Sequence, residues 1–178
     1  IRDVVLRRLD PLPPTAHDVL CAAALCHPSI DESMLPDLTN LSRDALSDCL
    51  EAAMAARLIE ESPSQIGCYR FSHDLVAETL ASELRQQQRT ELHAKIGTFL
   101  EKHSAPVAEI AHHYLLGAAA GTSLGAARFA HEAAMEADEL TDFSGAIALI
   151  DQGLEALDLG PDAPVLRIQM LIDRAQTL

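Results

Sequence analysis

Aromatic side chains and long apolar runs are scarce in this sequence, and tryptophan is absent. Only 3 % of the 178 residues are aromatic, although 48 % are apolar. Apolar content near one half argues against intrinsic disorder, which combines low hydrophobicity with high net charge. No apolar run reaches the roughly 18 residues of a membrane span, so no membrane partner is expected. The length suits one large domain or two small ones, each with its own core.

The sequence begins at Ile1 and not at methionine. Its first residues also lack the basic stretch followed by an apolar stretch that a secretory signal peptide would show. The last helical pattern runs up to Leu178. We therefore expect the chain to be a segment of a longer parent protein, whose function it serves only in part.

Basic residues are outnumbered, since 13 Lys and Arg stand against 27 Asp and Glu, for a net charge of −14. Residues 31–62 hold eight acids and two bases, and residues 105–178 hold eleven acids and three bases. A nucleic-acid surface needs clustered Lys and Arg to displace counterions from phosphate. The sequence therefore predicts no direct binding of nucleic acid by this chain.

The four cysteines lack the spacing of a metal site or a disulfide framework. Cys21, Cys26, Cys49 and Cys68 form no CxxC pair, and Cys21 and Cys26 would lie about 140° apart around a helix. We interpret them as reduced thiols that act as small apolar side chains, rather than as zinc ligands or disulfides. This interpretation predicts a cytoplasmic protein without a bound metal.

Catalytic motifs are missing as well. The sequence has no G-x-x-x-x-G-K-[ST] phosphate loop and no HExxH, and the glycines at 117, 121 and 125 carry no lysine, which predicts a helix-breaking loop. Consecutive residues on a helix point about 100° apart, so 72–74 cannot form a Ser-His-Asp triad. For the same reason His112 and His113 are predicted to be one exposed and one partly buried histidine, not a metal pair. We expect no enzyme activity and no cofactor in this chain.

What the sequence does have is helical periodicity. A first helix is predicted over 1–9, and further helices are predicted to start at Thr15, Asp31 and Ser42. Strand-like runs at 58–61 and 68–71 flank a turn-rich connector and predict the only hairpin. Three helices followed by a hairpin is the order of a winged helix, predicted over residues 1–83.

The remaining residues, 84–178, keep the helical period. Helices are predicted near 126–140 and 143–157, with a last one from about 163, and the Ala spacing suits a tetratricopeptide unit. Ala130 replaces the usual large aromatic and Gly153 stands where Ala is expected, which favours a packing repeat over a peptide-binding groove. The predicted fold is mainly α: a winged helix with one small β-hairpin, followed by an α-solenoid of tetratricopeptide-like helical pairs.

The predicted helix at 42–57 occupies the recognition-helix position of the winged helix. It carries three acids and two bases, namely Arg43, Asp44, Asp48, Glu51 and Arg57. Glu60 and Glu61 follow at the start of the wing. A DNA-reading helix would bring these carboxylates towards phosphates without enough compensating bases. The charge pattern therefore favours a winged helix that contacts protein over one that contacts DNA.

Several runs together resemble a known family. They are Arg8-Leu9-Asp10, Leu20-Cys21-Ala22-Ala23-Ala24, Leu58-Ile59, Tyr69-Arg70-Phe71-Ser72-His73-Asp74-Leu75-Val76 and Leu92-His93-Ala94-Lys95-Ile96. These runs resemble the segment that follows the ATPase core in STAND-type signalling ATPases, which include large ATP-binding transcriptional regulators of the LuxR family. The resemblance implies an upstream nucleotide-binding domain in the parent, which would bind ATP or ADP and hydrolyse ATP outside this chain.

The resemblance also implies a function and a site. The chain would be a regulatory segment that clamps the parent's nucleotide-binding domain and receives an inducer or protein partner on its repeats. His73, in the Phe-x-His-Asp element, would contact the β-phosphate of bound ADP. Ser72 is a candidate N-cap, which would place His73 at the positive end of a helix dipole. The alternative is a packing histidine on the face of Val76, Ala77 and Leu80.

Two other functions stay open from the residues alone. One is a stand-alone helical-repeat adaptor that binds protein, and the other is a DNA-binding winged-helix regulator. The last helix is expected to expose an apolar face that self-association would cover, formed by Leu166, Met170 and Leu171.

Overall fold

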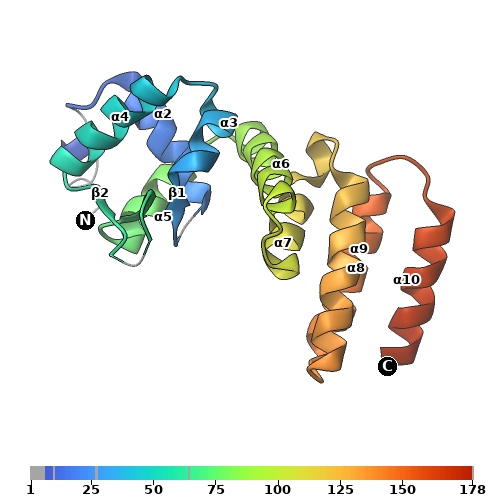
Figure 1. Cartoon of the computed structure of the whole chain (residues 1–178). Coiled ribbons are helices and arrows are strands. Elements are labelled where there is room, and N and C mark those ends of the chain that lie inside the picture. Colours follow the sequence, from blue (N-terminus) through green and yellow to red (C-terminus); the bar gives the residue numbers. More distant parts are fainter. Residues whose placement is uncertain (1–6, 10, 27, 64, 178) are drawn as a thin grey trace. The chain divides into compact units, whose positions relative to one another are not determined.

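A computed structural model of the chain describes residues 7–9, 11–26, 28–63 and 65–177. These residues are mainly helical, with a small three-stranded antiparallel sheet. The chain divides into two compact units, Ile1–Arg89 and Thr90–Leu178 (Figure 1). The division lies inside helix α6 (Gln86–Lys102), whereas the sequence places the boundary after residue 83. Most of the predicted helix over 1–9 lies outside the described residues, and 7–9 are helical.

The helices of the first unit begin where local signals favour a start. They are α2 (Pro14–Ala23), η1 (Ala24–Cys26), η2 (Glu32–Met34), α3 (Leu35–Thr39), α4 (Arg43–Ala55) and α5 (Asp74–Glu83). Asp31 accepts a hydrogen bond from Ser33 N, and Ser42 accepts one from Ala45 N, so both predicted starts are confirmed. The predicted Thr15 start is wrong. The fixed φ of proline suits the first turn, so α2 begins at Pro14 without a side-chain cap.

The sheet contains one strand more than the sequence predicts. Strands β2 (Ile59–Glu61) and β3 (Cys68–Phe71) confirm the predicted hairpin, and β1 (Ile30–Asp31) pairs with the other side of β3. All pairings are antiparallel. A two-residue strand is too short to show alternation, which is why the sequence pattern misses it.

Helix α2 organises the core of the first unit. It contacts α3, α4 and α5, and most of its length is buried, including small residues such as Ala16 and Ala23. Small side chains let neighbouring helices approach closely. The largest fully buried side chains of this unit are Val19, Leu20, Ile30, Leu35, Leu46, Leu50, Leu58 and Leu80.

The second unit is a series of helices in which each contacts the next along the chain from α7 to α10. They are α7 (Val107–Gly117), η3 (Ala118–Ala120), α8 (Ser123–Glu139), α9 (Phe143–Leu157) and α10 (Pro164–Thr177). Figure 1 shows α8, α9 and α10 side by side. The predicted glycine loop is shorter than expected: Gly117 ends α7, Gly121 has a φ of 97°, and Gly125 already lies in α8.

Met170 explains the two residues that depart from the repeat pattern. It is fully buried in the core between α8, α9 and α10. A Cβ on Gly153 would lie 2.5 Å from Met170 Cε and 3.2 Å from Ala130 Cβ. The small residues Ala130 and Gly153 therefore leave the space that Met170 fills.

The expected exposed face of α10 is partly wrong. Leu171 is exposed, but Met170 is buried and Leu166 is half-buried against the same core. The helix presents that face to its neighbours, because residues four apart share one side. The large apolar residues of α10 that are exposed are Val165, Ile168, Leu171 and Ile172. The described residues include no helix with the length and hydropathy to cross a bilayer.

Candidate functional site

His73 occupies the residue immediately before α5. Its backbone is extended, with φ −152° and ψ 140°, and its carbonyl accepts a hydrogen bond from Val76 N at 2.9 Å. The predicted Ser72 cap is wrong, because Ser72 Oγ donates to the Arg57 carbonyl at 3.0 Å instead. His73 is exposed, whereas Val76 and Ala77 are buried. Its side chain is thus not part of the core that these residues form.

The carbonyl oxygen that accepts the hydrogen bond from Ser72 belongs to Arg57, just after the last residue of α4. Arg57 adopts a left-handed conformation with φ 55°, and Leu58 N donates to the Ala53 carbonyl at 3.0 Å, which is the pattern of a Schellman motif. Arg8 Nη1 also donates to the Arg57 carbonyl, at 3.3 Å. The helix end therefore brings Arg8, Arg57 and Ser72 together.

These residues line an open groove of about 680 Å³ in the first unit. The groove is lined by Arg8, Met54, Arg57, Ile59, Glu60, Glu61, Ser72 and His73. Guanidinium and imidazole groups are good donors to phosphate oxygens. Of the two carboxylates, Glu60 forms an ion pair with Arg70 at 2.8 Å. The groove thus holds three cationic or potentially cationic side chains beside the carboxylates of Glu60 and Glu61.

Helix α5 begins with an acidic residue that faces solvent. Asp74 lies in the first turn and is exposed, and Glu78 one turn later is exposed too. A carboxylate at this position stabilises the helix dipole. The arrangement is consistent with Asp74 stabilising the start of α5.

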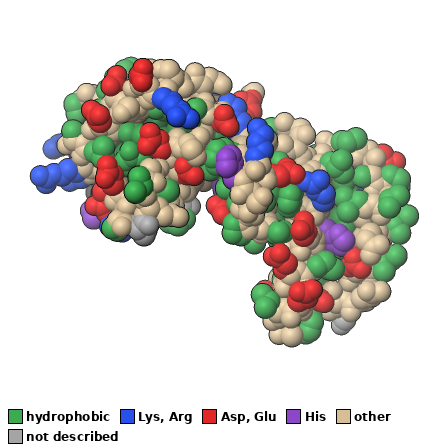
Figure 2. Space-filling model, viewed as in Figure 1, with side chains coloured by type: hydrophobic (Ala, Val, Ile, Leu, Met, Phe, Trp, Pro, Cys, Tyr) green, Lys and Arg blue, Asp and Glu red, His purple; other side chains and the backbone are tan. Residues whose placement is uncertain are grey.

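The charged residues of α4 form an exposed surface with an acidic excess. Arg43, Asp44, Asp48 and Glu51 are all exposed. Figure 2 shows acidic side chains spread over the visible surface of both units, with basic side chains in small groups between them. Such a surface suits a partner with basic side chains better than a phosphate backbone.

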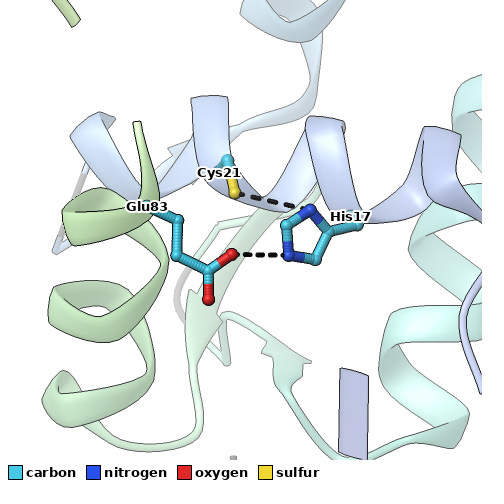
Figure 3. A group of neighbouring side chains, drawn as sticks. All are labelled: His17, Cys21 and Glu83. Atoms are coloured by element: carbon cyan, nitrogen blue, oxygen red, sulfur yellow. Dashed lines mark hydrogen bonds and ion pairs between the residues drawn. The ribbon is translucent and has the colours of Figure 1, made fainter. Parts of the chain in front are cut away.

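A second cluster joins α2 to α5 and was missed by sequence reasoning. His17 Nε2 lies 2.9 Å from Glu83 Oε2, and Cys21 Sγ lies 3.8 Å from His17 Nδ1 (Figure 3). Cys21 is buried, and burial, together with the charges of Glu83 and Asp18, raises the pKa of its thiol to about 12. The His-x-x-x-Cys spacing was the available signal. Glu83 comes from another helix, so no spacing could reveal it.

The two adjacent histidines of α7 differ in burial, as predicted, and the inner one is more deeply buried than expected. His112 is exposed and His113 is buried. His113 Nδ1 lies 3.0 Å from Nδ1 of His93 on α6, so one ring donates and the other accepts. Burial, followed by the nearby His93 and His112, lowers the pKa of His113 to about 3. A buried hydrogen-bonded histidine pair therefore links α6 and α7.

Comparisons with protein-family models, with curated proteins and with solved structures found no match to this chain. Its function has to be inferred from the groove at His73, from the acidic surface and from the His17 and His113 clusters.

Proposed function

We propose that this chain is a regulatory and interaction segment of a multidomain STAND-type ATPase of the kind found in LuxR-family transcriptional regulators. The observation that carries the proposal is that His73, in the element that resembles this family, is exposed in a groove shared with Arg8 and Arg57. A packing histidine would instead be buried. Such a set of donors suits a phosphate group.

In this proposal the groove faces the nucleotide bound to the nucleotide-binding domain of the same parent chain. His73 donates a hydrogen bond to the β-phosphate of ADP, with charge assistance when the imidazole is protonated. A ligand shifts a conformational equilibrium only by binding one state more tightly than the other. ADP would therefore favour the closed, inactive state, because only that state brings His73 to the phosphate.

The arrangement of elements supports the proposed modules. In the first unit, the order of helix, short strand, two helices and hairpin supports a winged helix, which we propose over 1–83. The successive contacts from α7 to α10 support a tetratricopeptide-like repeat region over 84–178. The acidic α4 surface suits a protein contact, and the repeats would receive an inducer or protein partner.

In this proposal, ATP hydrolysis takes place outside this chain. The parent would hydrolyse ATP through its nucleotide-binding domain, and this segment, located in the cytoplasm, would transmit the nucleotide state. The charge pattern gives the segment no direct role in binding nucleic acid.

The test uses the full-length parent. His73→Ala is expected to weaken ADP retention and to raise basal output, while ATP binding changes less, since the β-phosphate contact belongs to the ADP-bound state. Glu78→Gln is the matched control, because Glu78 is exposed on α5, the helix that His73 precedes, and does not line the groove. Unchanged ADP affinity and unchanged basal output in His73→Ala would overturn the proposal.

A stand-alone helical-repeat adaptor is the second candidate. The observation that favours it is the apolar stripe of α10, in which Val165 is 82 % and Ile168 is 58 % exposed. Exposed apolar patches mark interaction surfaces, and self-association through this stripe is one form of such an interaction. An adaptor would lose partner binding on Ile168→Glu and would not respond to His73→Ala.

A further inference from the structure

We propose that His17, Cys21 and Glu83 form a binding site for a zinc-like divalent cation, with one ligand atom from each residue. The inference is independent of the proposed function. His17 and Cys21 lie one turn apart on α2, and Glu83 is the last residue of α5. Figure 3 shows the three side chains pointing towards one another. Among the described residues, this is the group of potential ligands whose donor atoms all lie within 4.8 Å of one another.

The three donor atoms lie near one another, but not at the spacing of a bound ion. Bonds of about 2.0–2.3 Å from zinc to nitrogen, oxygen and sulfur place neighbouring ligand atoms roughly 3.3–3.8 Å apart. With one atom from each residue, the donors here lie within 4.8 Å of one another. His17 contacts Glu83 through Nε2 at 2.9 Å and Cys21 through Nδ1 at 3.8 Å. Because one ring nitrogen binds an ion, side-chain rotation must bring the other two donors to that nitrogen. Binding would replace the His17–Glu83 hydrogen bond by two bonds to the metal.

The chemistry of the donors selects the class of metal. Thiolate, imidazole and carboxylate are the ligands of zinc, whereas calcium and magnesium require sets of oxygen atoms. A thiolate and a carboxylate carry two negative charges, which balance the two positive charges of the ion. Three protein ligands leave the fourth position to water or to an exogenous ligand, as in zinc sites that keep an open position.

Burial gives the site an inner and an outer side. Cys21 is 4 % exposed, whereas the side chains of His17 and Glu83 are 33 % and 27 % exposed. The ion would enter past His17 and Glu83 and reach the sulfur on the inner side. Binding displaces the thiol proton of Cys21 to solvent, so metal uptake releases one proton from this group.

An ion at this site would bind α2 to the end of α5. The same two helices contact each other in the core of the first unit. Because the ligands come from both helices, the ion binds only the folded state and stabilises it. The arrangement without metal is a hydrogen-bonded cluster in which His17 bridges a thiol and a carboxylate, and the experiment separates the two.

The experiment titrates the whole chain with Co²⁺ and then with Zn²⁺. We expect one Co²⁺ per chain to give tetrahedral visible bands and a near-ultraviolet thiolate-to-cobalt band, both of which Zn²⁺ removes. Cys21→Ser is expected to abolish the thiolate band, and Cys49→Ser, another buried cysteine, to keep it. Glu83→Gln, on an accessible side chain, should fold normally and weaken Co²⁺ binding about tenfold or more.

Thermal unfolding supplies a second readout. Zn²⁺ should raise the Tm of the wild type and of Cys49→Ser but not that of Glu83→Gln. Absence of a thiolate-to-cobalt band in the wild type would overturn the site, as would retention of that band in Cys21→Ser. Equal Co²⁺ affinity in the wild type and Glu83→Gln would also overturn it, since metal would then be bound elsewhere.

Discussion

Gly117, the last residue of α7, lies against the backbone of α6. A Cβ at this position would lie 2.5 Å from the backbone nitrogen of Ala94. The backbone of Gly117 is right-handed, with φ −94° and ψ −1°, so alanine is excluded by the neighbouring helix and not by its own dihedral angles. The glycine is thus required by helix packing.

We predict that Gly117→Ala lowers the free energy of unfolding by about 1–3 kcal/mol, because backbone must shift to admit the methyl group. Urea denaturation followed by circular dichroism measures the loss. Gly125→Ala is the control: its Cβ would lie 3.3 Å from a side-chain atom of Tyr114 rather than 2.5 Å from backbone, and alanine favours the helix. Equal losses in both variants would contradict the packing argument.

His113 makes the stability of the second unit sensitive to pH. Its pKa is lowered from 6.5 to about 3 in the folded state. Between these values the unfolded chain binds a proton that the folded chain does not, so stability falls as pH falls from about 6.5 to about 3. The slope for one proton is about 1.4 kcal/mol per pH unit.

Urea denaturation over this pH range tests the His113 prediction. Because carboxylates also titrate there, the informative quantity is the difference between the wild type and a variant. His113→Gln, which keeps a hydrogen-bonding group but cannot titrate, should reduce the slope by about one proton. His112→Asn removes only the smallest of the three influences that lower the pKa of His113, so it should change the slope much less. A slope that His113→Gln does not alter would refute the assignment.

Helix α10 has two apolar faces with different roles. Met170 is fully buried, while Ile168 on another side of the helix is 58 % exposed. We predict that Met170→Ala costs about 2–5 kcal/mol, because it leaves a cavity beside Gly153. Ile168→Ala should change stability by only about 0.5 kcal/mol. Chemical denaturation of the two variants compares the faces, and similar losses would show that α10 is not packed in this orientation.

The helix starts show which local signals suffice. Asp31 and Ser42 cap as predicted because the donors they need lie two or three residues ahead in the same segment. Ser72 has the right residue type as well, but its hydroxyl donates to Arg57, 15 residues away in the sequence. A cap is therefore predictable only where no closer tertiary partner competes for the side chain.

Charge acts at the scale of the whole molecule. The net charge of −14 and the exposed acids of α4 oppose a second polyanion. We predict that the chain does not bind duplex DNA above background in fluorescence anisotropy at low salt, where electrostatic attraction is strongest. Micromolar binding that weakens steeply with added salt would contradict this prediction and would favour the DNA-binding alternative.

The sequence by itself determined the helical character, the hairpin, the acidic surface and the different burial of His112 and His113. Each of these follows from a period, a turn signal or a composition that lies within one segment. The sequence also identified His73 as a candidate site residue, through a local motif that resembles a family. It did not identify the Arg8 and Arg57 side chains, which line the same groove.

Only the tertiary structure decided which distant residues meet. The pairing of β1 with β3, the contact of Glu83 with His17, the His93–His113 pair and the space that Gly153 leaves for Met170 each join separate segments. The periodicity of a sequence shows which face of a helix is apolar, but it does not show which other element packs against that face. That choice is made by the packing of the whole core, where shape and volume must match between elements far apart in the sequence.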